Sequence, residues 1–312
     1  MLIYLLRRVL QAALLVFLVS SAAFMLVEAA PGDPFDRFDI DPAVAAAERH
    51  RLGLDRPLMV RYADWLGRAA RLDLGDSVKY GRPVRQLVAE RAPRTALLGA
   101  AALVLATLIG IPAGIMTGSR RNPLTAAARA LSLLVVSVPP LVTSFALLLL
   151  AARTRWFPVG GFPSSGDTSS LAALLPYLAL PALALALPLA GSLERLQSQA
   201  IRDALADPSM TAAMARGCSH RRVVWRHALR LSVVPVIAIY GVIIGSALSG
   251  SFAVEVVTSW PGLGALMYEA LVARDLYLVA GCAAAGALFL ALGILASDLA
   301  IALADPRIEA RA

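Results

Sequence analysis

The chain has 312 residues, of which 59% are hydrophobic and only 16% are charged, whereas an average soluble domain has about 25% charged residues. This composition excludes a disordered chain, a secreted disulfide scaffold and an ordinary soluble enzyme, and it indicates a protein that crosses a membrane several times. The net charge of +8 fits arginines flanking membrane segments, and the aromatic content of 6% does not favour nucleic-acid binding.

Six apolar stretches are long enough to cross a bilayer as helices, which requires about 20 mostly apolar residues. Helices are expected because lipid offers no hydrogen-bond partner to the backbone. The sequence therefore predicts an all-α integral membrane protein with six transmembrane helices. These spans are residues 9–27, 96–117, 130–150, 171–190, 233–254 and 278–304.

Arginines next to these spans predict their direction. Arg7 and Arg8 precede the first span, Arg120 and Arg121 follow the second, and the segment 191–230 after the fourth contains seven arginines. Because short cytoplasmic loops are enriched in basic residues, both termini are expected in the cytoplasm. A cleaved signal peptide is the alternative for the first span, but its apolar run of about 19 residues exceeds a signal core of 7–15.

The least hydrophobic segment lies between the first and second spans. We expect residues 31–95 to form a small extracytoplasmic subdomain of short helices and turns. The chain would then divide into an N-terminal tail with the first span (residues 1–30), this subdomain, and a core domain over residues 96–312.

The segment 191–230 is too long for a simple connection. Asp207 followed by Pro208 is typical of a helix N-cap and first turn. Good helix formers follow over 210–216, and Gly217 is typical of the residue after a helix end. Two interpretations remain open, namely a projection that docks into a soluble partner and a basic helix that lies on anionic lipid.

Two pairs of small residues, Gly241 with Gly245 and Ser246 with Gly250, lie four residues apart in the fifth span. Such pairs permit close helix contact. Packing within the chain is the favoured interpretation, and a seam between two subunits is the alternative.

One charge, Asp298, lies inside a predicted span. A charge in a membrane is costly and indicates function by default. Because Asp298 is near the cytoplasmic end of the sixth span, snorkelling or a structural pairing is the simpler interpretation.

The sequence offers no machinery for catalysis. A P-loop needs glycines followed by Lys and Ser or Thr, but the sole lysine, Lys79, follows Val78. The three histidines, His50, His220 and His227, lie outside the spans, so an intramembrane protease is not favoured. The few intramembrane charges argue against the proton relays of a secondary carrier. Any energy source is therefore expected in a separate subunit.

Several sequence blocks together resemble one family. Thr211-Ala212-Ala213-x-x-x-Gly217, followed by His227-Ala228-Leu229-Arg230 and Pro235, resembles the EAA loop of ABC importer membrane subunits, and within these the dipeptide/oligopeptide/nickel permeases. The resemblance covers nearly the whole chain. Further matching blocks are Leu5-Leu6-Arg7-Arg8, Ala30-Pro31-Gly32-Asp33-Pro34, Leu52-Gly53-Leu54-Asp55-Arg56-Pro57, Asp73-Leu74-Gly75, Trp260-Pro261-Gly262-Leu263-Gly264, Arg274-Asp275 and Asp305-Pro306-Arg307.

The resemblance implies that the short helix of segment 191–230 is a coupling helix seated in a cleft of an ATPase. The motif's glutamate is replaced by Thr211, and peptide permeases usually have basic residues at the positions of Thr211 and Met214. The ion pairs that other members of the family form at this contact are therefore not expected at the same positions of this chain. The residues expected at this contact are Thr211, Ala212, Ala213, Met214, Arg216, Gly217, His220, Arg221 and Arg222.

The same resemblance implies a set of partners. These are a second homologous permease subunit, two ABC ATPase subunits, an extracytoplasmic substrate-binding protein and the lipid bilayer of the inner membrane, without nucleic acid. No cofactor is expected on this chain, because ATP and Mg²⁺ would be used by the ATPases. Short peptides are the expected substrate; nickel chelates, glutathione or opines are alternatives. A stand-alone secondary carrier or channel is the alternative from another class.

One extracytoplasmic segment carries a further expectation. Glu255, Trp260, Pro261 and Gly262 lie at or just after the outer end of the fifth span. They are expected to form part of an outer gate or a contact with the binding protein. An aromatic anchor at the membrane interface is the alternative.

Overall fold

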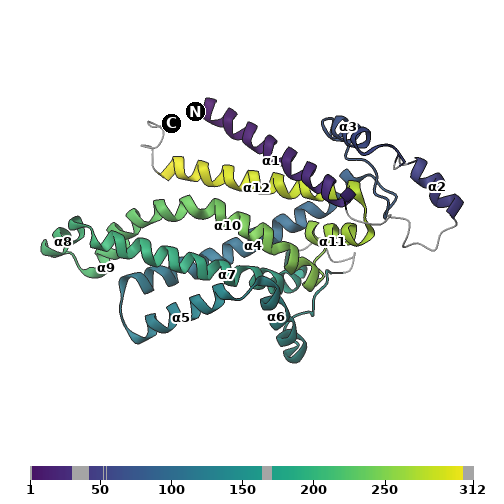
Figure 1. The fold of residues 1–312 in the computed structure, drawn as a ribbon. Coiled ribbons are helices and arrows are strands. Elements are labelled where there is room, and N and C mark those ends of the chain that lie inside the picture. The colour runs from purple at the N-terminus through teal and green to yellow at the C-terminus, as the bar shows by residue number, and fades with distance from the viewer. Residues whose placement is uncertain (1, 30–41, 52, 54, 164–170, 305–312) are drawn as a thin grey trace. The chain divides into compact units, whose positions relative to one another are not determined.

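The computed structural model describes residues 2–29, 42–51, 53, 55–163 and 171–304, and the regular elements in these ranges are helices (Figure 1). An isolated bridge joins Asp76 and Pro83. The elements are α1 (Leu2–Ala29), α2 (Pro42–Arg51), α3 (Leu58–Ala69), α4 (Val84–Ser119), α5 (Pro123–Ser137), α6 (Pro140–Thr154), α7 (Leu171–Ala206), α8 (Pro208–Ala215), α9 (His220–Arg222), the π-helix η2 (Val223–Ala228), α10 (Leu229–Thr258), α11 (Leu263–Ala273) and α12 (Leu276–Ala304).

Five helical stretches in this part of the chain are long and apolar enough to cross a membrane, and a bent pair of helices brings the number to six. The all-α membrane fold is therefore confirmed. The observed helices extend several of the predicted spans, because the polar turns at their ends continue the same backbone hydrogen bonding. The five stretches are Leu6–Ala29, Val84–Ser119, Ala172–Ala206, His220–Thr258 and Leu276–Ala300.

The third predicted span, residues 130–150, is wrong as a single helix. It consists of α5 and α6, which are bent by 105° relative to each other. Val138 has extended backbone angles, with φ −92° and ψ 120°, and Pro139 and Pro140 follow it. A proline ring disfavours helical angles in the residue before it and removes a backbone donor, so two consecutive prolines end α5 here.

The contacts group the chain into two compact units, which we describe separately. Unit one consists of Met1–Leu5, Ala96–Trp260 and Leu290–Ala312. Unit two consists of Leu6–Thr95 and Pro261–Phe289. The three-part division into residues 1–30, 31–95 and 96–312 stays a prediction.

Three glycines one turn apart bring α4 of unit one directly against α7. A Cβ atom added to Gly110, Gly114 or Gly118 would lie only 2.6 or 2.7 Å from a backbone carbonyl oxygen of α7. No side chain fits at that distance, so the two backbones contact each other. This spacing of small residues is the same device as the small-xxx-small motif of membrane helices.

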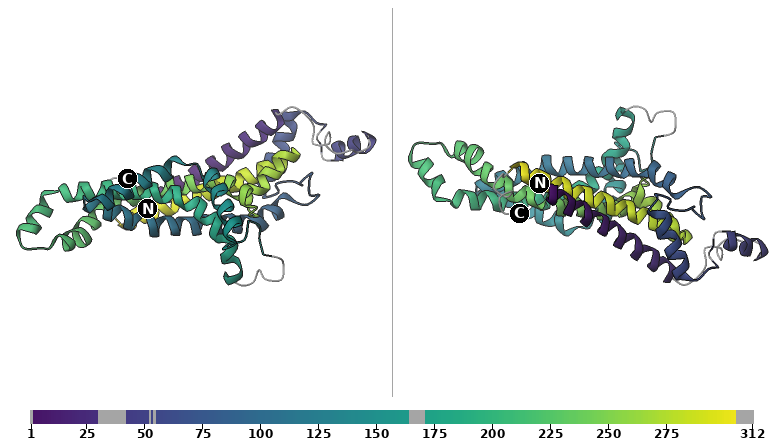
Figure 2. Two further views of the ribbon diagram at one scale, coloured as in Figure 1. Left: turned by 90° about the horizontal axis from the view of Figure 1, so that it is seen from below. Right: turned by 90° about the horizontal axis from the view of Figure 1, so that it is seen from above.

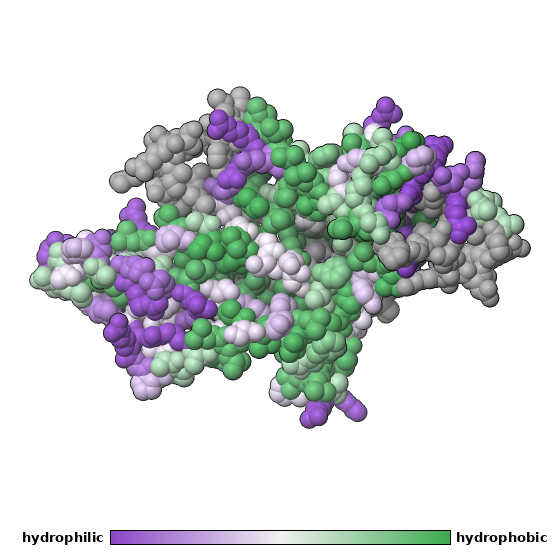
Figure 3. All heavy atoms as spheres, viewed as in Figure 1, coloured by the Kyte–Doolittle hydropathy of each residue, from purple (hydrophilic) through white to green (hydrophobic). Residues whose placement is uncertain are grey.

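The surface of unit one is divided by polarity. Leu131, Leu134, Phe145 and Leu149 on α5 and α6 are each more than half exposed, as lipid-facing residues are. Figure 3 shows hydrophobic residues over α6, while hydrophilic residues gather around α8 and α9. The helices therefore present an apolar girdle, and the α8–α9 connection emerges from it.

Unit two is built around the end of α1. Phe24 of α1 packs on Trp65 of α3 with ring centroids 5.2 Å apart, and Tyr62 donates a hydrogen bond to Ser21 at 2.8 Å. Trp65 is fully buried. The expected short helices between the first two spans are thus present as α2 and α3. The expected block Ala30–Pro34 lies outside the described residues, as do Leu52, Leu54 and Asp305-Pro306-Arg307.

Candidate functional site

The connection between α7 and α10 contains a short, capped helix. Asp207 has extended backbone angles, and its side chain accepts a hydrogen bond from the backbone N–H of Ser209 at 2.8 Å. This contact with Ser209 lowers the pKa of the Asp207 carboxyl group, because it favours the charged form. Pro208 occupies the first turn, where a missing N–H costs nothing. The predicted start of α8 is therefore confirmed.

The end of α8 is a glycine turn. Gly217 has φ +86°, and its N–H donates to the carbonyl oxygen of Met214 at 2.9 Å. The next N–H, of Cys218, reaches back to the carbonyl oxygen of Ala213 at 3.1 Å. These two bonds form a Schellman motif, which satisfies the last carbonyl groups of a helix. The prediction that Gly217 ends this helix is confirmed.

One face of α8 is anchored to its own unit. Met210 and Ala213 are 4% exposed and pack with Ile201 of α7 and with Val223 and Val224 of η2. Both views in Figure 2 show α8 and α9 at the far tip of the α7–α10 pair. The caps and this small core hold α8 in a defined orientation.

The opposite face of the connection is exposed. Met214 is 41% exposed, and Trp225 on η2 is 56% exposed. His220 lies with Nε2 3.3 Å from the backbone oxygen of Ser119, at the end of α4. The other exposed residues of this face are Thr211, Ala212, Arg216, Gly217, Arg221 and Arg222.

A groove of about 820 Å³ runs along unit one. Small residues of α10 form one wall, including Gly241, Gly245 and Gly250, and Leu185 and Pro188 of α7 form another. Four serines and Asp298 add polar groups to this otherwise apolar lining. The groove can therefore hold a chain or ligand of mixed polarity. The polar residues are Ser192, Ser246, Ser249, Ser297 and Asp298.

The glycines of α10 face other helices of unit one, whereas Ser246 is exposed, so the choice between packing within the chain and a seam between subunits stays a prediction. A Cβ on Gly245 would lie 3.2 Å from Leu290 of α12, and one on Gly250 would lie 2.8 Å from Leu185. The Ser297 hydroxyl accepts from Gly241 N–H at 3.1 Å and donates to the Ile237 carbonyl at 3.2 Å. A hydroxyl inserted into the backbone ladder marks a point where a helix bends easily.

A buried carboxylate joins three helices of unit one. Glu194 of α7 is 3% exposed and accepts hydrogen bonds from Thr117 of α4 and from Ser132 of α5, the latter at 2.5 Å. One turn further along α7, Gln197 donates to Ser232 at 2.8 Å. Glu194 was not among the residues predicted to be functional, although its position just after the apolar stretch 171–190 was a signal.

We expect Glu194→Leu to lower the free energy of unfolding by about 1 kcal/mol, because the Thr117 and Ser132 hydroxyl groups lose the carboxylate acceptor and keep only a carbonyl oxygen of their own helix. Glu194→Gln keeps one carbonyl oxygen and should cost less than Glu194→Leu. The measurement is unfolding of the purified protein in detergent. Equal stability of the leucine variant and the original protein would contradict this account.

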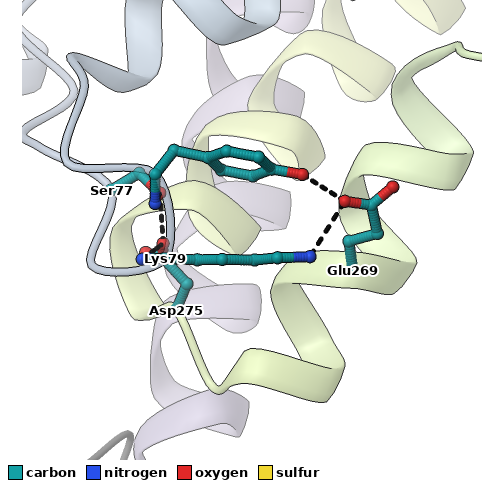
Figure 4. Close-up of polar contacts among 5 residues, drawn as sticks. Ser77, Lys79, Glu269 and Asp275 are labelled. Carbon is teal, nitrogen blue, oxygen red and sulfur yellow. Dashed lines mark hydrogen bonds and ion pairs between the residues drawn. The ribbon is translucent and has the colours of Figure 1, made fainter.

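A polar clamp in unit two ties the turn before α4 to the turn before α12 (Figure 4). Asp275 is fully buried and accepts from Ser77 Oγ at 2.5 Å, from Lys79 N at 3.0 Å and from Leu278 N at 3.2 Å. Lys79 Nζ lies 2.9 Å from Glu269 of α11, which also accepts from the Tyr80 hydroxyl. Burial raises the pKa of Asp275, although the surrounding donors oppose this shift.

The ion pair of the clamp should depend on pH. Burial favours a higher pKa for Glu269, but the hydrogen bonds from Tyr80 and Lys79 and the charge of Lys79 prevail and lower it. Its contribution is therefore complete above the ordinary pKa of 4.5 and is lost as the pH falls through the lowered pKa. For Lys79, burial lowers the pKa but the bond and charge of Glu269 prevail and raise it, so that contribution is complete below pH 10.5 and is lost as the pH rises through the raised pKa.

Glu269→Gln should therefore increase amide exchange over residues 77–81 at pH 7, by no more than about fivefold because the pair is partly exposed. The difference from the original protein should shrink as the pH falls below 4.5 and vanish once the pH is below the lowered pKa of Glu269, where both proteins carry a neutral group at this position. Asp76→Asn, in the same exposed turn, is the matched control and should leave exchange unchanged. A difference that persists at low pH would contradict a role for the charge.

Among the residues that the structure describes, no three His, Cys, Asp or Glu side chains gather closely enough to hold a metal ion. The candidate functional features of the described residues are thus the groove of unit one and the exposed α8–α9 connection.

Two family profiles match the chain in sequence order. Residues 110–310 match the binding-protein-dependent transport system inner membrane component, and residues 1–99 match the N-terminal region of membrane components of such systems. The chain belongs to this family of ABC importer permeases. The permease is therefore a multi-pass inner-membrane component that works with a binding protein and an ATPase.

Individual relatives match over almost their full lengths. A putative peptide permease protein of Brucella suis is 36% identical, with 99% of each chain covered. The oligopeptide transport system permease protein AppB of Bacillus subtilis is 32% identical, with 98% of this chain and 99% of the relative covered. The dipeptide transport system permease protein DppB of Lactococcus lactis is 30% identical, with the same coverage.

The expected contact residues of the permease do not all share one environment. Ala213 is buried against η2 and α7, so its methyl group is not on the exposed face of α8, whereas Ala212 and Thr211 are. Trp225 was not among the expected residues, although an aromatic side chain between arginines was a signal for it. Compared with the predicted contact residues, the exposed face therefore lacks Ala213 and includes Trp225.

The expected outer-gate residues also differ from one another. Glu255 and Trp260 are fully buried in unit one, and Trp260 packs edge-on against Phe162 at 5.4 Å. The indole ring therefore does not form an exposed contact surface or an anchor in the lipid interface. In unit two, Pro261 is partly exposed and Gly262 is the N-cap of α11.

Proposed function

We propose that this permease forms one half of a translocation pathway for short peptides. The other half would be a second homologous permease subunit, with two ATPase subunits on one side and an extracytoplasmic binding protein on the other. The relatives quoted above have names for peptide, oligopeptide or dipeptide transport. Their match over nearly the full chain supports the same substrate class here.

The observation that carries the proposal is the construction of α8. It is capped at both ends, packed on one face and exposed on the other. A helix of this kind can transmit a displacement, because it moves with α7 and α10 instead of deforming. We propose that its exposed face seats in a cleft of the ATPase, and that ATP and Mg²⁺ bind there and not to this chain.

The orientation follows from charge. Arginines near the start of α1 and between α7 and α10 favour the same side of the membrane for these segments under the positive-inside rule. We propose that this side is the cytoplasm, with both termini and α8 facing the ATPases. Residues 31–95 then face the binding protein.

The groove of unit one supplies a wall for the pathway. Its glycines and serines offer backbone and hydroxyl groups between apolar side chains. A peptide has alternating polar and apolar groups, so such a lining suits it without selecting one sequence. Selection of the substrate is therefore proposed to lie mainly with the binding protein.

The test is reconstitution of the permease with its partner subunits in liposomes. Uptake of labelled peptides against a gradient should require ATP, the ATPases and the binding protein, and the lone permease should move nothing uphill. Concentrative uptake by the lone permease would instead support a stand-alone carrier. Uptake of nickel chelates but not of peptides would overturn the substrate assignment while preserving the machinery.

A further inference from the structure

A cationic pocket lies in unit two, between the end of α2, α3 and the first turn of α12. Its volume is about 370 Å³. Four arginines and one aspartate line it, together with His50, Gly53 and Tyr277. The arginines are Arg51, Arg56, Arg61 and Arg68, and the aspartate is Asp64.

Part of this positive charge is balanced inside the protein. Arg56 pairs with Asp64 at 3.2 Å, and the buried Arg61 pairs with Glu28 of α1. His50 lies 3.9 Å from Asp55. The buried Nε of Arg61 has no hydrogen-bond partner within the described part of the chain. A buried guanidinium with a spare donor is costly, and an added acceptor would remove that cost.

Arg68 leaves the pocket positively charged. Its guanidinium carbon lies 5.4 Å from the centroid of the Tyr277 ring, which fixes the side chain by a cation–π contact. No carboxylate of the described ranges forms an ion pair with it. Arg68 is fixed in position without a carboxylate partner in the described ranges, and the Arg61 side chain beside it has an unused donor. Two neighbouring guanidinium groups of this kind favour an oxyanion with several acceptor oxygens.

The pocket lies beside the ends of two helices that are long and apolar enough to span a membrane. Glu28, the partner of Arg61, is in the last turn of α1, and Tyr277 is in the first turn of α12. Both helices are apolar enough to span. Helix α3 packs on the apolar part of α1 through Trp65 and Phe24. The ends of spanning helices lie in the headgroup region of a bilayer, so a pocket at such ends is expected among lipid headgroups.

The exposed face of α3 has a composition that is typical of the headgroup region of a bilayer. Met59 is 69% exposed and Val60 is 44% exposed, although α3 otherwise carries charged residues. Apolar residues beside arginines are typical of a helix lying in the interface plane, where the apolar groups reach the acyl boundary.

We propose that this pocket binds the phosphate group of an anionic phospholipid. The phosphodiester oxygens would accept from Arg68, which the Tyr277 ring holds in place, and the pocket-lining Arg51 and Arg61 would add positive charge around the phosphate. The site is independent of which substrate the permease carries. An acidic side chain of the binding protein is the rival occupant, but the level of the pocket at the span ends favours the lipid.

The test uses the full-length permease in detergent, with lipid retention measured by native mass spectrometry. Phosphatidylglycerol is compared with phosphatidylcholine, and glycerol phosphate is added in a parallel arm. The original protein should retain phosphatidylglycerol preferentially. An arginine that lines the pocket beside the bound phosphate is expected to contribute about fivefold, so Arg51→Gln with Arg68→Gln should weaken retention about 25-fold.

The matched control is Arg71→Gln, which removes an exposed arginine of the same segment that does not line the pocket. It should leave retention within about twofold of the original, because it does not touch the phosphate. Arg61 is left intact, since its loss would leave Glu28 without its partner. Melting temperature in phosphatidylcholine alone verifies that the double variant folds.

Three results would overturn the proposal. One is equal retention of phosphatidylglycerol by the double variant and by Arg71→Gln. Another is displacement of the lipid by glycerol phosphate at equal concentration, which would assign the pocket to a soluble phosphate. The third is loss of affinity for the binding protein with unchanged lipid retention, which would assign it to an acidic side chain.

Discussion

Gly217→Val should reduce ATP-dependent uptake about tenfold while the permease still inserts into the membrane. Gly217 has φ +86°, a conformation that costs an L-residue about 1–2 kcal/mol and a β-branched residue more. A Cβ here would meet no atom within 4 Å, so the effect comes from the backbone and not from a clash. Relief of the strain breaks the two hydrogen bonds that end α8 and releases the helix from its fixed orientation.

The measurement is peptide uptake by liposomes that contain the permease with its partner subunits, together with the amount of permease in the membrane. Gly217→Asn is the matched control, because asparagine tolerates the left-handed conformation, and it should retain uptake within about twofold. A valine variant that transports like the original protein would argue against α8 as the element that receives the force.

Gly114→Leu should destabilise unit one more than any other change considered. A Cβ at this position would lie 2.7 Å from the Glu194 carbonyl oxygen and 2.6 Å from Cβ of Gln197. Because both atoms belong to a packed helix, α4 and α7 must separate, at a cost of about 1–3 kcal/mol or more. The separation also pulls Thr117 away from the buried Glu194 carboxylate, one turn along α4.

Thermal unfolding of the purified permease in detergent tests this expectation. Gly99→Ala is the control on the same helix, since a Cβ there meets no atom within 4 Å. It should leave the melting temperature unchanged or raise it slightly, because alanine favours helix over glycine. Similar losses at both positions would show that the contact of α4 with α7 is looser than described.

Local features of the sequence were sufficient for several elements. The N-cap Asp207, the first-turn Pro208 and Gly217 predicted both ends of α8, and each acts through bonds to residues within a few positions. The spans were likewise predictable, because the length of an apolar stretch is set by bilayer thickness. The two consecutive prolines, Pro139 and Pro140, are also a local signal, and the third span is bent by 105° there.

Other features depend on pairs of residues far apart in the sequence. Thr211 and Ala213 both belong to the sequence motif that predicts the contact. Ala213 is nevertheless buried, because it packs with Ile201 and Val223. The pairing of Glu194 with Thr117 and Ser132, and of Asp275 with Ser77, requires knowing which helices are neighbours. No periodicity in one segment contains that information.

The sequence by itself determined the membrane class, the spanning helices and the capped α8, since these follow from apolar length and from bonds between near neighbours. The tertiary structure alone decided which face of α8 is exposed, where the groove of unit one runs and which charges are buried. The physical reason is that burial and electrostatic pairing depend on distances in space, and the order of residues does not specify those distances.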